Sequence, residues 1–237
     1  MILVCSAWEE ETKYLDSHQD KFKIIHLGIG YLQAALNLQR FLFSRGKAEH
    51  GASQASRVLS YRDLPQIEKI YFIGTAGLIS KADINWDMPV FSVNKVSLSL
   101  PLSFKKQAYI PKAYPEFSLR TNAKSNVADC LSALEITNSS ELSSEIERIV
   151  FAGNGEDGEN AEIGVREQCQ NGISQRSLLE NMELYGVAQV AAEFNIPCSA
   201  LLGVTNRTDA SAHQDWSSNH KRVSKLLCKY FSELVQG

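Results

Sequence analysis

The sequence lacks the features that mark several protein classes. It contains no apolar run of about 18 residues, so we expect no membrane-spanning helix. Its 24 basic and 27 acidic residues give a net charge of −3, and no long run of one charge suggests contact with nucleic acid. The N-terminus shows no basic segment followed by a long apolar stretch, so we expect no signal peptide. These absences favour a cytoplasmic globular protein that binds neither nucleic acid nor a membrane.

Pairs of metal-binding or redox residues are also missing. The five cysteines are odd in number and widely spaced, and none forms a Cys-x-x-Cys pair. We therefore expect reduced thiols that mostly fill the core. The five histidines form no cluster of metal-ligand spacing, and we expect His213 and His220, seven residues apart, to be solvated. The sequence thus predicts no metal site.

Short apolar runs alternate with helical patterns along the chain. Strands are expected over 1–6, 22–27, 69–73, 89–96 and 198–205, with further candidates over 133–137 and 148–152. Helices are expected after Gly30 as far as Gly46, over 182–194 and over 215–235. The segment between Ser97 and Asn126 is the least regular and should form surface loops. Because most strands are continuous apolar runs, we predict an α/β fold with a mainly parallel sheet covered on both faces. One domain over residues 1–237 is sufficient.

Polar motifs follow several of these strands, where α/β proteins usually bind their ligands. They are "AWEEE" after the first strand, "GTAG" at 74–77, "ENMELYG" at 180–186 and "TNRTD" at 205–209. Each has an ordinary structural explanation. A glutamate run begins a helix, "GTAG" makes a tight turn, Glu180 and Glu183 favour a first helical turn, and "TNRTD" starts a turn. Taken singly, these motifs identify no function.

Taken together and in order, the motifs resemble the nucleoside phosphorylase and nucleosidase superfamily. The resemblance rests on "SAWEEE", "GIGYLQAA", "IGTAGLI", "ENMELYGVAQVAAEFNIP" and "GVTNRTDASAHQDW". It is closest to the small nucleosidase branch, which includes methylthioadenosine/S-adenosylhomocysteine nucleosidase and futalosine hydrolase. It covers about residues 1–95 and 178–235. It implies a single twisted mixed β-sheet flanked by α-helices, a purine nucleoside substrate, no cofactor, and a homodimer or larger homo-oligomer.

The resemblance also assigns roles to individual residues. Glu11, the third glutamate of its cluster, would activate the attacking water, which requires a base within hydrogen-bond reach. Thr75 would lie beside the water or phosphate site. Met182 would pack on the ribose, and Glu183 would accept hydrogen bonds from its hydroxyls and favour an oxocarbenium-like transition state. An aromatic wall for the purine is expected from a strand between 130 and 155, with Phe151 as the candidate.

Three departures from the family pattern bear on the reaction. Asn206 stands where adenine-cleaving nucleosidases have an aspartate, and this resembles 6-oxopurine enzymes and futalosine hydrolases. An amide cannot give up a proton, but its donor can stabilise charge on the leaving purine. No arginine is found at the expected phosphate position, where Phe72 stands, so hydrolysis is favoured over phosphorolysis. Leu202 replaces an arginine that supports the water site in the nucleosidases.

The sequence therefore predicts a purine nucleosidase that hydrolyses the N-glycosidic bond of a 6-oxopurine nucleoside such as futalosine. Glu11 and Asn206 are its catalytic candidates, and Thr75, Met182, Glu183 and Phe151 are its substrate-binding candidates. Three alternatives stay open. They are a methylthioadenosine/S-adenosylhomocysteine nucleosidase, a purine nucleoside phosphorylase and a non-catalytic relative that binds a nucleoside.

Overall fold

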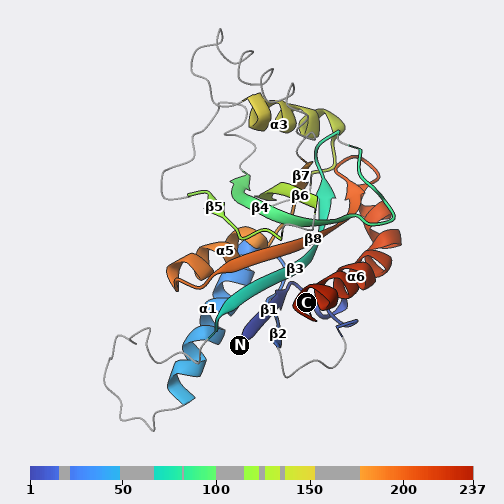
Figure 1. The fold of residues 1–237 in the computed structure, drawn as a ribbon. Helices are drawn as coiled ribbons and strands as arrows, with labels where there is room; N and C mark the ends of the chain where they lie inside the picture. Colours follow the sequence, from blue (N-terminus) through green and yellow to red (C-terminus); the bar gives the residue numbers. More distant parts are fainter. Residues whose placement is uncertain are drawn as a thin grey trace.

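The computed structural model describes residues 1–15, 22–48, 67–81, 83–99, 115–122, 126–133, 137–152 and 177–236. These residues form one mixed sheet with helices packed around it (Figure 1). The strands are β1 (Ile2–Ser6), β2 (Phe22–His26), β3 (Lys69–Leu78), β4 (Val90–Ser99), β5 (Phe117–Ser118), β6 (Asn126–Ala133), β7 (Ser177–Glu180) and β8 (Cys198–Arg207). The helices are the 3₁₀ turn η1 (Glu9–Glu11), α1 (Tyr31–Ala48), α3 (Ser140–Ala152), α5 (Leu184–Glu193) and α6 (Ala212–Gln236).

The sheet has an open end and a closed end. Strands β2, β1 and β3 pair in parallel, and β3 continues in parallel with β8. Strand β3 also pairs with β7, β7 with β6, β6 with β4, and β4 with β8, so these five strands close into a ring. The pairings of β3 with β7 and of β4 with β8 are antiparallel. The predicted α/β fold with a twisted mixed sheet is confirmed.

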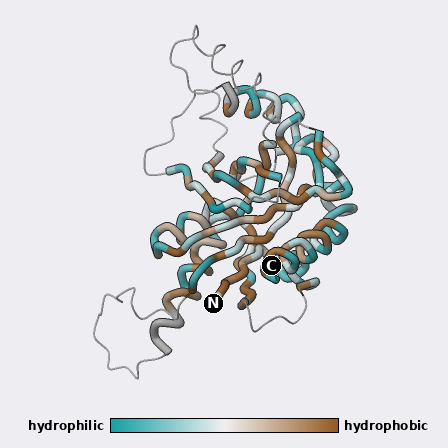
Figure 2. Tube along the Cα trace, in the orientation of Figure 1, coloured by the Kyte–Doolittle hydropathy of each residue, from teal (hydrophilic) through white to brown (hydrophobic). Residues whose placement is uncertain are grey.

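Three apolar clusters fill the space between the sheet and its helices. Leu38 and Leu42 of α1 and Val187 of α5 belong to the largest cluster, on one face of the sheet. Leu227 and Phe231 of α6 pack on the other face. A third cluster lies beneath α3. Hydrophobic residues accordingly follow the central strands in Figure 2.

Helix α5 crosses the start of α1 at backbone contact. A Cβ atom added to Gly186 would lie 2.0 Å from the carbonyl oxygen of Tyr31. Only a residue without a side chain permits this approach. The crossing brings the residues that precede α5 beside the turn that precedes α1, and the candidate site lies there.

Several predicted elements differ from the structure. Strand β3 was expected to end before "GTAG", but it runs through these residues to Leu78. Its second half stays extended because β8 and β7 pair with it on either side. Glu180 was expected in a first helical turn and instead ends β7. The helix begins only at Leu184.

The two strand candidates in the middle of the chain have different outcomes. Strand β6 ends at Ala133, the first residue of the candidate 133–137, and residues 134–136 lie outside the described ranges. The second, 148–152, is the last turn of α3. Leu142, Ile146 and Val150 share one apolar cluster and recur every four residues, which is helical spacing that a short window around 148–152 hides. Phe151 therefore belongs to a helix, and its side chain lies outside the described part of the structure.

The expectations about cysteines and membranes can be compared with the described residues. Cys5, Cys130, Cys198 and Cys228 are buried free thiols, as expected, and Cys169 lies outside the described ranges. No helix in the described part of the chain has the length and apolar character needed to cross a membrane.

Candidate active site

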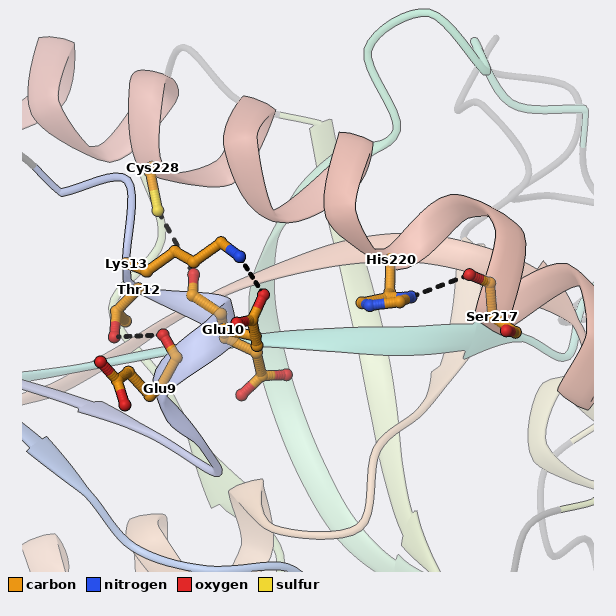
Figure 3. A network of polar contacts seen from close by, with 8 residues as sticks. Glu9, Glu10, Thr12, Lys13, Ser217, His220 and Cys228 are labelled. Carbon is orange, nitrogen blue, oxygen red and sulfur yellow. Dashed lines mark hydrogen bonds and ion pairs between the residues drawn. The ribbon is translucent and has the colours of Figure 1, made fainter.

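The glutamate cluster forms the single turn η1 directly after β1, and its three members lie in different surroundings. Glu9 is exposed, and Glu10 forms an ion pair with Lys13 (Figure 3). This pair lowers the pKa of Glu10. Glu11 is only 3% exposed. The ordinary explanation of the motif, a charged helix start, fits the positions of Glu9 and Glu10, whereas Glu11 points into the protein.

Glu11 is held by two segments of backbone. Its Oε2 accepts a hydrogen bond from the Ala7 amide at 3.0 Å. Its Oε1 accepts from the Thr75 amide at 2.8 Å and from the Thr75 hydroxyl at 3.1 Å. Burial raises the pKa of Glu11 to about 7, against the Thr75 hydrogen bonds and with a smaller contribution from the negative charge of Glu183. A carboxyl group with this pKa can both take and return a proton near neutral pH.

Glu183 is the second buried carboxylate of this network and is 6% exposed. Its Oε1 accepts from the Gly30 amide at 2.9 Å, and its Oε2 accepts from Asn181 Nδ2 at 3.1 Å. Gly30 has φ = 89°, a conformation that favours glycine, in the turn between β2 and α1. Burial raises the pKa of Glu183 as well. The "GIG" at the start of "GIGYLQAA" thus has a structural use, because its second glycine supplies a donor for this carboxylate.

Asn181 connects the two carboxylates and was not singled out from the sequence. Its Nδ2 donates to the Thr75 carbonyl at 3.0 Å as well as to Glu183. Its Oδ1 accepts from the amides of Glu183 and Leu184 at 3.0 and 2.8 Å. An asparagine just before a helix is a common N-terminal cap, and that signal could have identified it.

Asn206 lies on the neighbouring strand, close to this network. It is 6% exposed and pairs with Gly77, two residues along β3 from Thr75. Its Oδ1 accepts from the Thr205 hydroxyl at 2.8 Å, and its Nδ2 donates to the Arg207 carbonyl at 2.9 Å. A Cβ atom on Gly77 would lie 3.2 Å from Asn206 Nδ2, so this glycine leaves room for the amide.

Met182 lies next to the network in the chain, whereas Leu202 and Phe72 lie in the apolar core. Met182 is half-buried between the buried Asn181 and Glu183. Leu202 is fully buried on β8 in the largest apolar cluster, opposite Gly74, and Phe72 belongs to the same cluster. The structure thus joins Glu11, Thr75 and Glu183 into one hydrogen-bonded network, with Asn206 and Met182 beside it.

An aromatic stack borders the turn that carries Glu11. The rings of Trp216 and His220 lie 4.7 Å apart and nearly parallel, at 15°. Trp8 packs on both, and His213 stacks on Trp216. His220 projects from α6 toward this turn in Figure 3. His213 is exposed, as expected, whereas His220 is half-buried beside Trp8 and Trp216.

Comparisons with known proteins bear on the fold of the chain. A family model described as the phosphorylase superfamily matches residues 166–236. A futalosine hydrolase mutant of Helicobacter pylori superposes with a TM-score of 0.64 at 15% identity, covering 99% of this chain and 98% of that one. The fold is similar to that of this solved structure over nearly the whole chain. The resemblance inferred from the sequence is therefore confirmed.

Two methylthioadenosine/S-adenosylhomocysteine nucleosidases are similar to the same extent. The Helicobacter pylori enzyme with butyl-thio-DADMe-Immucillin-A gives a TM-score of 0.63 at 14% identity. The Neisseria meningitidis enzyme in complex with methylthio-immucillin-A gives 0.62 at 15% identity. Both alignments cover 99% of this chain and 97% of the other. No protein in a search of the curated proteins matches this chain.

The described residues offer acid–base and hydrogen-bonding chemistry at this candidate site. Among them, no group of three or more His, Cys, Asp or Glu side chains could hold a metal ion. What converges instead is a carboxyl group of near-neutral pKa, a second buried carboxylate and two amide side chains. This set suits the movement of a proton and the stabilisation of positive charge.

Proposed function

We propose that the protein is a purine nucleosidase that hydrolyses the N-glycosidic bond of a 6-oxopurine nucleoside, with futalosine as the first candidate. The observation that carries the proposal is the pair of buried carboxylates, Glu11 and Glu183, joined through Thr75 and Asn181. The superfamily fold supports the reaction class, and Asn206 supports the choice of base.

Counting hydrogen bonds suggests where the reactants bind. A carboxylate offers about four acceptor positions. With the described residues, Glu11 uses two on Oε1 and one on Oε2, so its open position among them is on Oε2. Glu183 uses one position on each oxygen, which leaves each of them one for a hydroxyl group. This count suits one water at Glu11 and the two ribose hydroxyls at Glu183.

The proposed reaction follows from these positions. Ionised Glu11 takes a proton from water as the oxygen attacks the anomeric carbon. The carbon–nitrogen bond to the purine breaks, and its electron pair leaves with the base. Glu183 holds the ribose hydroxyls and stabilises the positive charge that develops on the sugar. The Asn206 amide would donate to the departing purine, which finally gains a proton while Glu11 returns to its ionised form.

Hydrolysis is favoured over phosphorolysis by the surroundings of Thr75. A phosphate dianion is best bound by arginine side chains. No described arginine or lysine donates to Glu11, Thr75 or Glu183. Phe72 lies in the apolar core at the position where the resemblance leads us to expect a phosphate-binding arginine.

The direct test is purine release from futalosine, inosine and methylthioadenosine, each with and without phosphate. We expect hypoxanthine release from a 6-oxopurine nucleoside at a rate that phosphate does not change. A strict requirement for phosphate would identify a phosphorylase. Nucleoside binding by calorimetry without any turnover would support the non-catalytic alternative instead.

The choice of base is tested by replacing Asn206 with aspartate. A 6-oxopurine presents acceptors at N7 and O6, whereas adenine presents an amino donor, so a carboxylate should repel the former and accept the latter. We expect the ratio of kcat/KM for methylthioadenosine to that for futalosine to rise by roughly tenfold or more. Asn219→Asp is the control, because this amide donates to the nearby Thr205 carbonyl from α6. An unchanged ratio in Asn206→Asp would mean that Asn206 does not read the base.

The proposed homo-oligomer has a candidate contact surface on α1. Four large apolar side chains at and near this helix are exposed at helical spacing: Ile29, Leu32, Leu36 and Phe43. We propose that a second copy of the chain covers this stripe, which begins beside Gly30 of the site. Leu32, 62% exposed, lies within it, so Leu32→Glu should lower the sedimenting mass to that of a monomer. Gln214→Glu on exposed α6 should leave the mass unchanged. Equal masses for the two variants would contradict this surface.

A further inference from the structure

Asn181 uses every hydrogen bond that its side chain can make. A primary amide has two N–H donors and an oxygen with two acceptor positions. Both donors are engaged, with the Thr75 carbonyl on β3 and with Glu183 Oε2. Both acceptor positions are engaged as well, by the amides of Glu183 and Leu184. The residue is 4% exposed, so water cannot easily replace these contacts.

The partners of Asn181 come from the two halves of the site. Thr75, whose carbonyl it contacts, donates its amide and hydroxyl to Glu11. Glu183, on the other side, is also held by Gly30 at the start of α1. The amide of Asn181 is thus the side-chain link between the strand that holds Glu11 and the carboxylate beside α5.

The arrangement requires both an oxygen and a nitrogen at this position. The oxygen faces two N–H donors at the start of α5, a role that aspartate could also fill. The nitrogen faces a carbonyl oxygen and a carboxylate oxygen, both of which are acceptors. An ionised carboxylate there would meet two acceptors with no proton to share.

We propose that Asn181 is a positioning residue that fixes the Glu183 carboxylate, and through Thr75 the orientation of Glu11, for the reaction. The proposal rests on the proposed nucleosidase function. Asn181 contacts neither the water nor the base, and it acts by keeping one face of Glu183 occupied so that the other is presented to the ribose hydroxyls. A role limited to capping α5 would depend on its oxygen alone.

The test is Asn181→Asp. This change keeps an oxygen that can cap α5 and replaces the amide donor by a carboxyl group, which donates only when it is protonated. Below the pKa of the new carboxyl group, its hydroxyl can still donate to Glu183. Above that pKa it is ionised, and it repels Glu183. We therefore expect kcat/KM relative to the unmodified protein to be within a few-fold at pH 5 and to fall roughly 10- to 100-fold by pH 8. A ratio that stays constant with pH would overturn the proposal.

Two further variants separate positioning from a loss of folding. Asn37→Asp is the matched control, since within the described ranges the one side-chain hydrogen bond of Asn37 goes to the Leu27 carbonyl, at 2.8 Å. Its kcat/KM ratio should not change with pH. Glu183→Gln combined with Asn181→Asp should lose less activity than the product of the two single losses, because both changes remove the same function. Multiplying losses would overturn the proposal.

The role of Asn181 can be judged even if the protein hydrolyses no nucleoside. The Glu183 carboxyl group can be titrated by carbon-13 NMR, with its signal assigned from Glu183→Gln. Asn181→Asp should raise its midpoint, and Asn37→Asp should leave it unchanged. A raised midpoint without purine release would reject the proposed nucleosidase function and support the contact between Asn181 and Glu183. Purine release with an unmoved midpoint would retain the nucleosidase and reject the role of Asn181.

Discussion

Glu11→Gln is expected to lower kcat by roughly 10²- to 10⁴-fold, the range over which a positioned general base contributes. Glutamine has almost the same shape and cannot accept the proton of the attacking water. It places an amide donor against either the Ala7 or the Thr75 donors, so a modest change in stability is expected. A stopped assay of purine release should show the loss of turnover. Calorimetry should show that nucleoside binding is retained.

The neighbouring glutamate supplies the control. Glu10→Gln removes a carboxylate from the same turn and breaks its ion pair with Lys13 at the surface. Its kcat should stay within about twofold of the unmodified protein, because exposed pairs contribute little. Loss of turnover in Glu10→Gln with normal turnover in Glu11→Gln would show that the base is misassigned.

The raised pKa of Glu11 predicts how the rate depends on pH. The base must be ionised, and burial raises the pKa of this group from 4.5 to about 7. In the free protein, kcat/KM should therefore increase tenfold per pH unit below about pH 7 and level off above it. An exposed glutamate would give a plateau already near pH 5.

Glu183→Gln has the second largest expected effect, a loss in kcat/KM of roughly 10²- to 10³-fold, typical for removal of a group that stabilises transition-state charge. The amide cannot accept on both sides, since one end would present N–H donors to Gly30 or Asn181. The negative charge that faces the developing oxocarbenium ion is also lost. The measurement is kcat/KM for a ribonucleoside and for its 2′,3′-dideoxy analogue.

The comparison of the ribonucleoside with its 2′,3′-dideoxy analogue tests whether Glu183 binds the ribose hydroxyls. The unmodified protein should prefer the ribonucleoside, and Glu183→Gln should reduce that preference. Glu193→Gln, at the exposed far end of α5, should behave as the unmodified protein. A preference for ribose hydroxyls that survives in Glu183→Gln would assign their recognition to other residues.

The sequence supported predictions where local pattern decides structure. Continuous apolar runs identified β1, β2, β3, β4 and β8, and helical spacing identified α1, α5 and α6. It misjudged "GTAG", because whether β3 ends at Ile73 or Leu78 depends on pairing with β7 and β8, which are more than 90 residues away in the chain. It misjudged 148–152 because a five-residue apolar window carries no period.

The site residues that could be predicted from the sequence are those whose side chains match motifs of the resembled superfamily. Glu11, Thr75 and Glu183 were identified in that way, and the structure joins them. Ala7 and Gly30 contribute peptide groups, which have no residue-specific signal in a sequence. Asn181 was not predicted, because the resemblance assigned roles within this motif only to Met182 and Glu183.

The hydrogen bonds from backbone amides to Glu11 and Glu183 have a consequence for how the sequence around such a site can change in evolution. The amides of Ala7, Thr75 and Gly30 hold Glu11 and Glu183, and an amide stays in place when its side chain is exchanged. Surrounding residues can therefore drift while the two carboxylates keep their spacing. The fold itself tolerates extensive exchange of side chains, since this chain shares it with the Helicobacter pylori futalosine hydrolase mutant at only 15% identity. Searches for distant relatives would gain more from matching backbone donors around two glutamates than from matching the residues that carry those donors.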